Sequence, residues 1–122
     1  MTKVISKTKT AIVTGANRGI GLAIAKGLSE NENIRVLAAA RIAKDAAAMV
    51  RDIGNGSIAV KIDLSVPEDA AAQAKVIEAE YGPIDILVNN AGILIPGSGL
   101  NVSISDLTQT LTVNAIAPFA LI

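Results

Sequence analysis

The sequence contains no cysteine, no histidine and no tryptophan, and aromatic residues make up only 2% of its 122 residues. Without cysteine the chain has no disulfide, no thiolate chemistry and no sulfur-ligated metal, which agrees with a reducing compartment. Without histidine it has neither a Ser-His-Asp triad nor an imidazole metal site. We therefore predict no metal site in this chain.

The sequence also lacks net charge, because its 11 basic and 11 acidic residues cancel. A few lysines within Met1–Thr10 are the only concentration of like charge, so we expect neither nucleic acid nor an anionic membrane as a partner. The apolar run Ala11–Thr14 ends at Gly15, which is too short for the roughly 7 to 15 apolar residues of a signal peptide. No run reaches the roughly 18 residues of a membrane span. We expect a cytoplasmic protein.

Short apolar runs alternate with longer segments of helical period, and apolar residues make up 51% of the chain. This alternation is typical of repeated strand-helix-strand units around a parallel sheet. The sequence therefore predicts one α/β domain over residues 1–122. The predicted strands are Thr10–Thr14, Ile34–Ala40, Ser57–Asp63 and Ile84–Asn89.

The first two predicted helices follow the first two strands. The first begins after Gly19, frays near Asn31–Asn33 and carries an apolar face. The residues expected on that face are Ile20, Ala23, Ile24 and Leu28. The second covers about Ala43–Ile53 and is closed by Gly54.

The third helix has Ser65 as a candidate N-cap and Pro67 in its first turn, and it ends at Gly82-Pro83. A flexible loop follows the fourth strand. Its marker residues are Gly92, Pro96, Gly97 and Gly99. The last helix is predicted to be capped by Ser103 or Ser105 and to reach Pro118–Ile122. One face of it carries Leu107, Leu111, Asn114 and Ala115.

The strongest local signal is Thr14–Gly21, which reads TGANRGIG between an apolar strand and a helix. A strand-to-helix turn needs residues without a Cβ atom, and a diphosphate needs close approach of backbone N–H groups. Gly15, Gly19 and Gly21 meet these needs, and the free amides of the first helical turn then face the phosphates. The strand-helix setting favours this interpretation over a plain tight turn. The Gly-Lys-Ser/Thr of an ATP or GTP hydrolase does not occur.

Three further motifs follow in order: Asp63-Leu64 ends the third strand, Asn89–Gly92 reads NNAG after the fourth, and Asn114 follows Val113 in the last helix. Singly, these residues fit a strand cap, a turn and a satisfied polar contact. Together with the spacing of the glycine turn they resemble the classical short-chain dehydrogenase/reductase family. The resemblance implies a Rossmann-type, doubly wound parallel sheet. It also implies hydride transfer between a nicotinamide dinucleotide and a small carbonyl or alcohol substrate.

The resemblance assigns roles to individual residues. Asp63 corresponds to the family's adenine-contacting residue and Asn114 to the Asn of its catalytic tetrad. The predicted cofactor-binding residues are Gly15, Asn17, Arg18, Gly19, Ile20, Gly21, Arg41, Asp63, Leu64, Asn90, Ala91, Gly92 and Val113.

The end of the second strand indicates which nucleotide is bound. NAD-binding relatives place a carboxylate there, about 20 residues past the turn, to hold the ribose 2′-hydroxyl. This chain instead reads Leu37–Arg41 without a carboxylate. Arg41 and Arg18 are suited to a 2′-phosphate. We therefore predict NADP(H) over NAD(H).

The resemblance also implies a Ser and a Tyr-x-x-x-Lys pair beyond Asn114, and neither is present. The only tyrosine, Tyr81, has Asp85 four positions on, and the last lysine is Lys75. We expect the chain to be the N-terminal, cofactor-binding part of a protein roughly twice as long, truncated after the fourth strand and the following helix. Alone it should be inactive, with the fourth strand as an apolar edge.

Three functions remain open from the sequence. The first is the cofactor-binding half of an NADP-dependent oxidoreductase. The second is a catalytically silent dinucleotide-binding module, and the third is a structural partner that completes its sheet with another chain. A homo-oligomer formed through the last helix is a further hypothesis.

Overall fold

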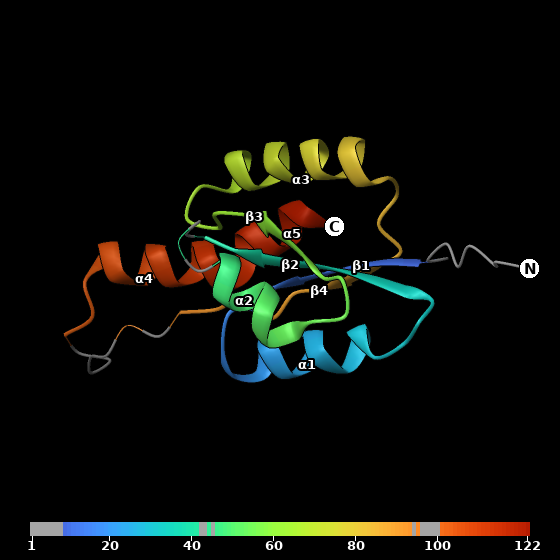
Figure 1. Ribbon diagram of the computed structural model, residues 1–122. Coiled ribbons are helices and arrows are strands. Elements are labelled where there is room, and N and C mark those ends of the chain that lie inside the picture. The colour runs from blue at the N-terminus through green and yellow to red at the C-terminus, as the bar shows by residue number, and fades with distance from the viewer. Residues whose placement is uncertain (1–8, 42–43, 45, 94, 96–100) are drawn as a thin grey trace, which may run out of the picture.

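A parallel sheet forms the middle layer of the computed structural model, which describes residues 9–41, 44, 46–93, 95 and 101–122 (Figure 1). Its strand order is β3-β2-β1-β4. The strands are β1 (Lys9–Thr14), β2 (Ile34–Ala40), β3 (Ile58–Lys61) and β4 (Ile86–Val88). The chain moves outward from β1 to β3 and then returns to the other side of β1. This reversal makes the sheet doubly wound, as predicted, and ligands of such sheets bind where the direction reverses.

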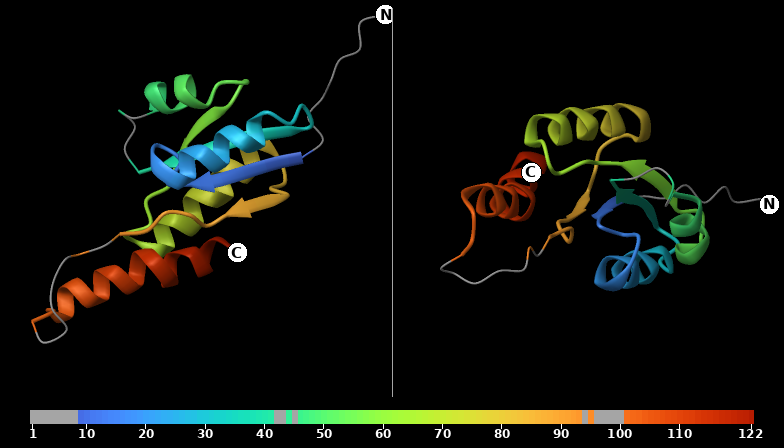
Figure 2. Two further views of the ribbon diagram at one scale, coloured as in Figure 1. Left: turned by 90° about the horizontal axis from the view of Figure 1, so that it is seen from below. Right: turned by 90° about the vertical axis from the view of Figure 1, so that its left-hand side faces the viewer.

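Helices cover both faces of the sheet (Figures 1 and 2). On one face lie α1 (Gly19–Ser29) and α2 (Ala46–Ile53). On the other lie α3 (Pro67–Tyr81), the π-helical turn η2 (Thr112–Ile116) and α5 (Ala117–Leu121). The helix α4 (Ile104–Leu111) continues into η2 and extends beyond the sheet. No helix in the described part of the chain is long and apolar enough to cross a membrane.

Alternate residues of β2 divide the core into two clusters, as expected for a strand buried on both faces. Leu37 and Ala39 face the cluster under α3 and α5. Val36, Ala38 and Ala40 face the cluster under α1 and α2. The second face is built largely from alanine, so its helices can lie close to the strands.

The buried face of α1 differs from the predicted one. Gly21, Ala25 and Ser29 are buried, whereas Ile20 is 74% exposed. Ala23 is exposed too, and the side chains of Ile24 and Leu28 only flank the core. The predicted apolar face was therefore wrong at Ile20 and Ala23. The three buried residues are small, because a helix that lies close to the sheet has room only for small side chains, whether or not they are hydrophobic.

Strands β3 and β4 are shorter than predicted, and the carboxyl end of β3 bonds outside the ladder. The N–H of Asp63 donates to Gln73 Oε1 at 2.8 Å, which takes Asp63 out of β3. Ser65 does not cap α3: the N-cap position is Val66, and the Ser65 hydroxyl donates to Asp63 Oδ1 at 2.7 Å. The predicted start of the second helix at Ala43 lies outside the described residues, and α2 begins at Ala46.

The last helix begins as predicted, with Ser103 Oγ accepting from the N–H of Asp106 at 3.0 Å. Its predicted face is not the buried one, because Val113 and Ala117 are buried and the residues expected on that face are half or largely exposed. Leu107 and Leu111 lie in α4, which extends beyond the sheet, whereas the π-turn η2 inserts an extra residue and rotates only the face that follows it. Pro96, Gly97 and Gly99 of the predicted loop lie outside the described residues.

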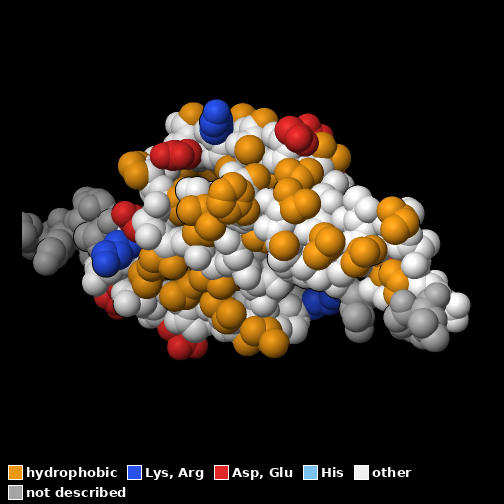
Figure 3. Space-filling view, turned by 180° about the vertical axis from the view of Figure 1, so that it is seen from behind, with side chains coloured by type: hydrophobic (Ala, Val, Ile, Leu, Met, Phe, Trp, Pro, Cys, Tyr) orange, Lys and Arg blue, Asp and Glu red, His pale blue; other side chains and the backbone are white. Residues whose placement is uncertain are grey.

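Large hydrophobic side chains remain on the surface. Phe119 is 78% exposed, and Ile104 and Ile122 are similarly exposed. Figure 3 shows many hydrophobic side chains across the face seen from behind. The strand β4 pairs only with β1 within the described sheet, so it lies at an edge, as the sequence predicted.

The amino end of the sheet is closed by Arg35. Its guanidinium donates to Thr10 Oγ1 at 3.1 Å and to the carbonyl oxygen of Tyr81, and it lies 5.5 Å from the centre of the Tyr81 ring. The N–H of Thr10 also donates to Asp85 Oδ2 at 2.8 Å. This end of the sheet is therefore occupied by the protein's own polar groups, whereas the carboxyl end is open.

Candidate functional site

The glycine turn joins β1 to α1 in the way its composition predicts. Gly15 and Gly19 have φ values of 63° and 59°, in the left-handed region that side chains disfavour. Arg18 between them is extended, with φ of −162°, and occupies the N-cap position of α1. A Cβ atom on Gly21 would lie 2.2 Å from the carbonyl oxygen of Gly15. Each of the three glycines is thus required for a physical reason.

Thr14 and Asn90 hold this turn against the end of β4. The hydroxyl of Thr14 accepts from the N–H groups of Asn90 and Ala91, each at 3.0 Å, and donates to the carbonyl oxygen of Val88 at 3.3 Å. The Asn90 carboxamide donates to the carbonyl oxygens of Thr14 at 3.2 Å and Gly15 at 3.4 Å. Asn90 therefore holds the turn through side-chain hydrogen bonds, although it does not line the cavity itself.

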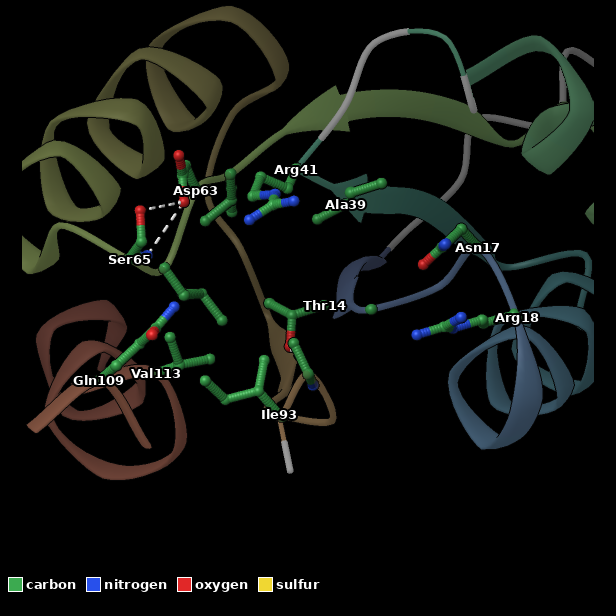
Figure 4. Close-up of a pocket in the computed structure, with 16 residues that line it drawn as sticks. Thr14, Asn17, Arg18, Ala39, Arg41, Asp63, Ser65, Ile93, Gln109 and Val113 are labelled. Carbon is green, nitrogen blue, oxygen red and sulfur yellow. Dashed lines mark hydrogen bonds between the residues drawn. The ribbon is translucent and has the colours of Figure 1, made fainter. Parts of the chain in front are cut away.

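A cavity of about 360 Å³ opens in front of the turn, at the carboxyl ends of β1, β2 and β3 (Figure 4). Its lining is part polar and part apolar. The lining residues are Thr14, Gly15, Asn17, Arg18, Ala39, Ala40, Arg41, Ile62, Asp63, Leu64, Ser65, Ala91, Gly92, Ile93, Gln109 and Val113. Its position is the one at which doubly wound sheets bind their ligands.

The charges of the cavity are divided between two regions. Asn17 and Arg18 lie on the side of the glycine turn, and Asp63 and Ser65 lie on the opposite side (Figure 4). Arg41 follows the end of β2 and is exposed. In Figure 4 the Arg41 side chain lies between Asp63 and Ala39, whereas Arg18 lies on the side of the turn, so the two arginines place positive charge at two points of the cavity wall.

The Asp63 carboxylate is held by Ser65. Its Oδ1 accepts from the Ser65 N–H at 3.0 Å and from the hydroxyl at 2.7 Å. These two hydrogen bonds, helped by the nearby charges of Arg41 and Lys61 and opposed by partial burial, lower the pKa of Asp63 below 3.8. The group is therefore a fixed anion and hydrogen-bond acceptor at neutral pH.

Asn114 lies in η2 and joins the last helix to the segment after β4. Its Oδ1 accepts from the Ile93 N–H at 2.8 Å, and its Nδ2 donates to the Ile93 carbonyl oxygen at 2.9 Å. Both ends of the carboxamide are thus committed to one residue of the cavity wall. The side chain is a satisfied polar contact, and a part in catalysis stays a prediction.

Most of the predicted cofactor-binding residues meet at the cavity. Those in its wall are Gly15, Asn17, Arg18, Arg41, Asp63, Leu64, Ala91, Gly92 and Val113. The other predicted residues, Gly19, Ile20, Gly21 and Asn90, are not in its lining. Gly21 and Asn90 shape the turn from behind, and Gly19 and Ile20 begin α1.

Sequence reasoning missed several wall residues, among them Ser65, Ile93 and Gln109. Ser65 carried a usable signal, because a serine two residues after an aspartate is typical of a turn in which the carboxylate accepts from the backbone. Ile93 and Gln109 carried none, since only the crossing of the last helix brings Gln109 to this cavity.

The family model described as short chain dehydrogenase matches residues 9–122. The chain belongs to the short-chain dehydrogenase family. One relative is the 3-oxoacyl-(acyl-carrier-protein) reductase FabG of Buchnera aphidicola subsp. Baizongia pistaciae. It is 34% identical over 106 residues, which cover 87% of this chain and 43% of the relative.

Solved short-chain dehydrogenase structures share the fold. A double mutant of a short-chain dehydrogenase/reductase from Serratia marcescens superposes with a TM-score of 0.83 at 32% identity, covering 94% of this chain and 48% of the other. A metagenomic short-chain oxidoreductase in complex with NADP gives a TM-score of 0.82 at 36% identity, covering 94% and 53%. This chain spans about half the length of the short-chain dehydrogenases that it matches.

Proposed function

We propose that this chain is the dinucleotide-binding half of an oxidoreductase that uses NADP(H) and acts on a carbonyl or alcohol group. The observation that carries the proposal is the cavity at the switch point, bounded by the glycine turn on one side and by Asp63 on the other. Membership of the short-chain dehydrogenase family and the NADP complex of the metagenomic relative support it. Residues 1–122 would form one domain or the first part of one.

The residues at the cavity fit such a cofactor region by region. Gly15 and the free amides that begin α1 suit the diphosphate, because backbone N–H groups at a helix start attract anions. Arg18 and Arg41 suit a 2′-phosphate, which two guanidinium groups can bind with charge-assisted hydrogen bonds. Asp63 provides an acceptor for the adenine amino group, and Val113 provides an apolar contact for the ring.

The catalytic contribution of the chain is limited to positioning. When bound, the dinucleotide supplies the hydride. Asn114 holds the backbone of Ile93 in the cavity wall and would set the position of the segment that follows Ala91 and Gly92. The 122 residues contain no Tyr-x-x-x-Lys pair, no histidine and no cysteine. We propose that the proton donor is supplied from outside these residues.

Titration of the protein with NADPH, followed by the fluorescence of the reduced nicotinamide, tests the binding. We expect saturable binding to a single site. Absence of binding would refute the dinucleotide function and favour a chain that only completes a sheet with a partner.

Charge reversal at Arg41 tests the preference for NADP(H). Loss of a charge-assisted hydrogen bond costs about 1.5 to 3 kcal/mol, or roughly 10- to 100-fold in affinity. Arg41→Asp should therefore weaken NADPH by about that factor and leave NADH unchanged or better bound. Arg51→Asp is the matched control, because Arg51 is exposed on α2 and is not a residue of the cavity wall. An unchanged ratio of the two affinities in Arg41→Asp would show that the 2′-phosphate is not bound there.

A second candidate is a catalytically silent dinucleotide-binding module, and both candidates predict that the 122 residues alone do not turn over a substrate. The second candidate is favoured by the missing Tyr-x-x-x-Lys pair. Oxidation of NADPH should be followed with a panel of aldehydes and ketones. We expect no turnover by the 122 residues alone, and turnover would show that another group of this chain donates the proton.

A further inference from the structure

Gln109 is a polar residue of the cavity wall. It comes from α4 and lines the cavity together with Asp63 and Val113. Within the described residues its carboxamide makes no hydrogen bond, whereas the carboxamides of Asn90 and Asn114 are both engaged. Gln109 is exposed, so its amide is available to a bound molecule.

The side chain lies on the same side of the cavity as Asp63. In Figure 4 the side chains of Gln109 and Val113 extend from the last helix toward the side where Asp63 and Ser65 lie, away from Asn17 and Arg18. Leu64 and Ile62 also line the cavity and are buried. This region therefore combines apolar walls with the polar side chains of Asp63, Ser65 and Gln109, which suits a flat ring with a polar edge.

The Asp63 carboxylate and the Gln109 carboxamide differ in the hydrogen bonds that they can make. The Asp63 carboxylate can only accept, and its orientation is fixed by Ser65. A glutamine carboxamide carries both donors and an acceptor. The pairing edge of adenine presents an amino donor beside a ring nitrogen acceptor, N1. An acceptor-only group and a group that can donate, on the same side of one cavity, match the two polar groups of that edge.

We propose that Gln109 is a specificity-determining residue for the base of the nucleotide, donating from its carboxamide to N1 of adenine while Asp63 accepts from the amino group. The assignment rests on the proposed dinucleotide binding. It makes the last helix a contributor to base recognition, in addition to the end of β3.

Two nucleotides and two variants test the assignment. NADPH and its hypoxanthine counterpart differ only at the base edge, where hypoxanthine has an oxygen acceptor and a protonated N1. The measurement is the dissociation constant of each, from the fluorescence of the reduced nicotinamide. Gln109→Glu nearly preserves the shape of the side chain, but its carboxylate can only accept hydrogen bonds. It therefore cannot bond to the adenine N1, which is also an acceptor, and can bond to the protonated N1 of hypoxanthine. Gln109→Leu removes both capacities.

We expect the wild-type protein to bind NADPH at least about 10-fold more tightly than the hypoxanthine nucleotide. Gln109→Glu should move this ratio toward hypoxanthine by about 10-fold, and Gln109→Leu, which removes the donor to the adenine N1, should weaken NADPH about 3- to 10-fold and the hypoxanthine nucleotide by less, so that it lowers the ratio. A general effect of the added charge acts on both nucleotides, so it cancels in the ratio. Thr108→Glu, which adds the same charge to an exposed position outside the cavity lining, should leave the ratio unchanged.

Three results would overturn the assignment: a wild-type protein that does not discriminate between the bases, a ratio unmoved by Gln109→Glu, or a ratio moved equally by Thr108→Glu. In each of these cases NADPH is still bound, so the proposed dinucleotide function survives. Failure of the wild-type protein to bind NADPH refutes that function and the assignment with it.

Discussion

Substitution of Gly21 by alanine tests whether the glycine turn is as tightly packed as the structure indicates. The new Cβ atom would lie 2.2 Å from the Gly15 carbonyl oxygen and 2.3 Å from Asn90 Nδ2. Both distances are far below van der Waals contact, and one of the two atoms belongs to the backbone. The helix start must therefore move away from the turn, or Asn90 must leave its two carbonyl acceptors.

The size of the effect follows from these two alternatives. Forcing an extra methyl group into a packed site costs about 1 to 3 kcal/mol. Each hydrogen bond that Asn90 gives up costs about 0.5 to 1.5 kcal/mol. Either alternative costs about 1 to 3 kcal/mol, so we expect Gly21→Ala to lower the free energy of unfolding by that amount and to weaken NADPH binding as well.

Gly27→Ala in the same helix is the matched control. Nothing lies within 4 Å of a Cβ atom built on Gly27, and the residue is exposed. Alanine is a better helix former than glycine by about 1 kcal/mol, so this variant should be more stable than the wild type. Urea unfolding followed by circular dichroism measures both changes. If Gly21→Ala unfolds at the wild-type urea midpoint, the close contact between the turn and Asn90 is refuted.

Two further predictions concern the cavity wall. Asn114→Ala leaves the N–H and the carbonyl oxygen of Ile93 without their partners, so NADPH affinity should fall about 3- to 10-fold, as for a lost hydrogen bond; an unchanged dissociation constant would show that Asn114 does not set this wall. The pKa of Asp63 is lowered in the folded protein, so its contribution to stability is present above pH 3.8 and is lost as the pH falls through the folded-state value. Ser65→Ala should reduce this loss in acid, which thermal melts of the two proteins below and above pH 3.8 would reveal; parallel curves would contradict it.

The features that the sequence predicted best are those encoded within short segments. The segment Ile34–Ala40, which is apolar except for Arg35, forms β2 with the bounds expected, because a strand buried on both faces is largely apolar. The positive φ angles of Gly15 and Gly19 follow from the order of the residues in a tight turn. Asp63 reached the cavity because parallel strands end at the same edge of a sheet.

What could not be predicted depends on tertiary packing. The face of α1 is chosen by how closely the helix approaches the sheet, which favours Ala25 over Ile20. The burial of the last helix depends on how far α4 extends beyond the sheet and on the π-turn at Thr112–Ile116, for which the sequence carries no pattern that we can identify. Gln109 enters the cavity only because that helix crosses the end of the sheet, so no spacing along the chain indicates it.

The closed amino end of the sheet has a spectroscopic consequence. Tyr81, stacked beside Arg35 there, is the only tyrosine, and tryptophan is absent. Its emission therefore reports on that end alone, while the emission of bound NADPH would report on the opposite end. Following both signals through one denaturation would show whether the two ends of the sheet unfold in a single cooperative transition or one after the other. No engineered label is needed, because Tyr81 provides the chromophore at one end and the added NADPH would provide the other.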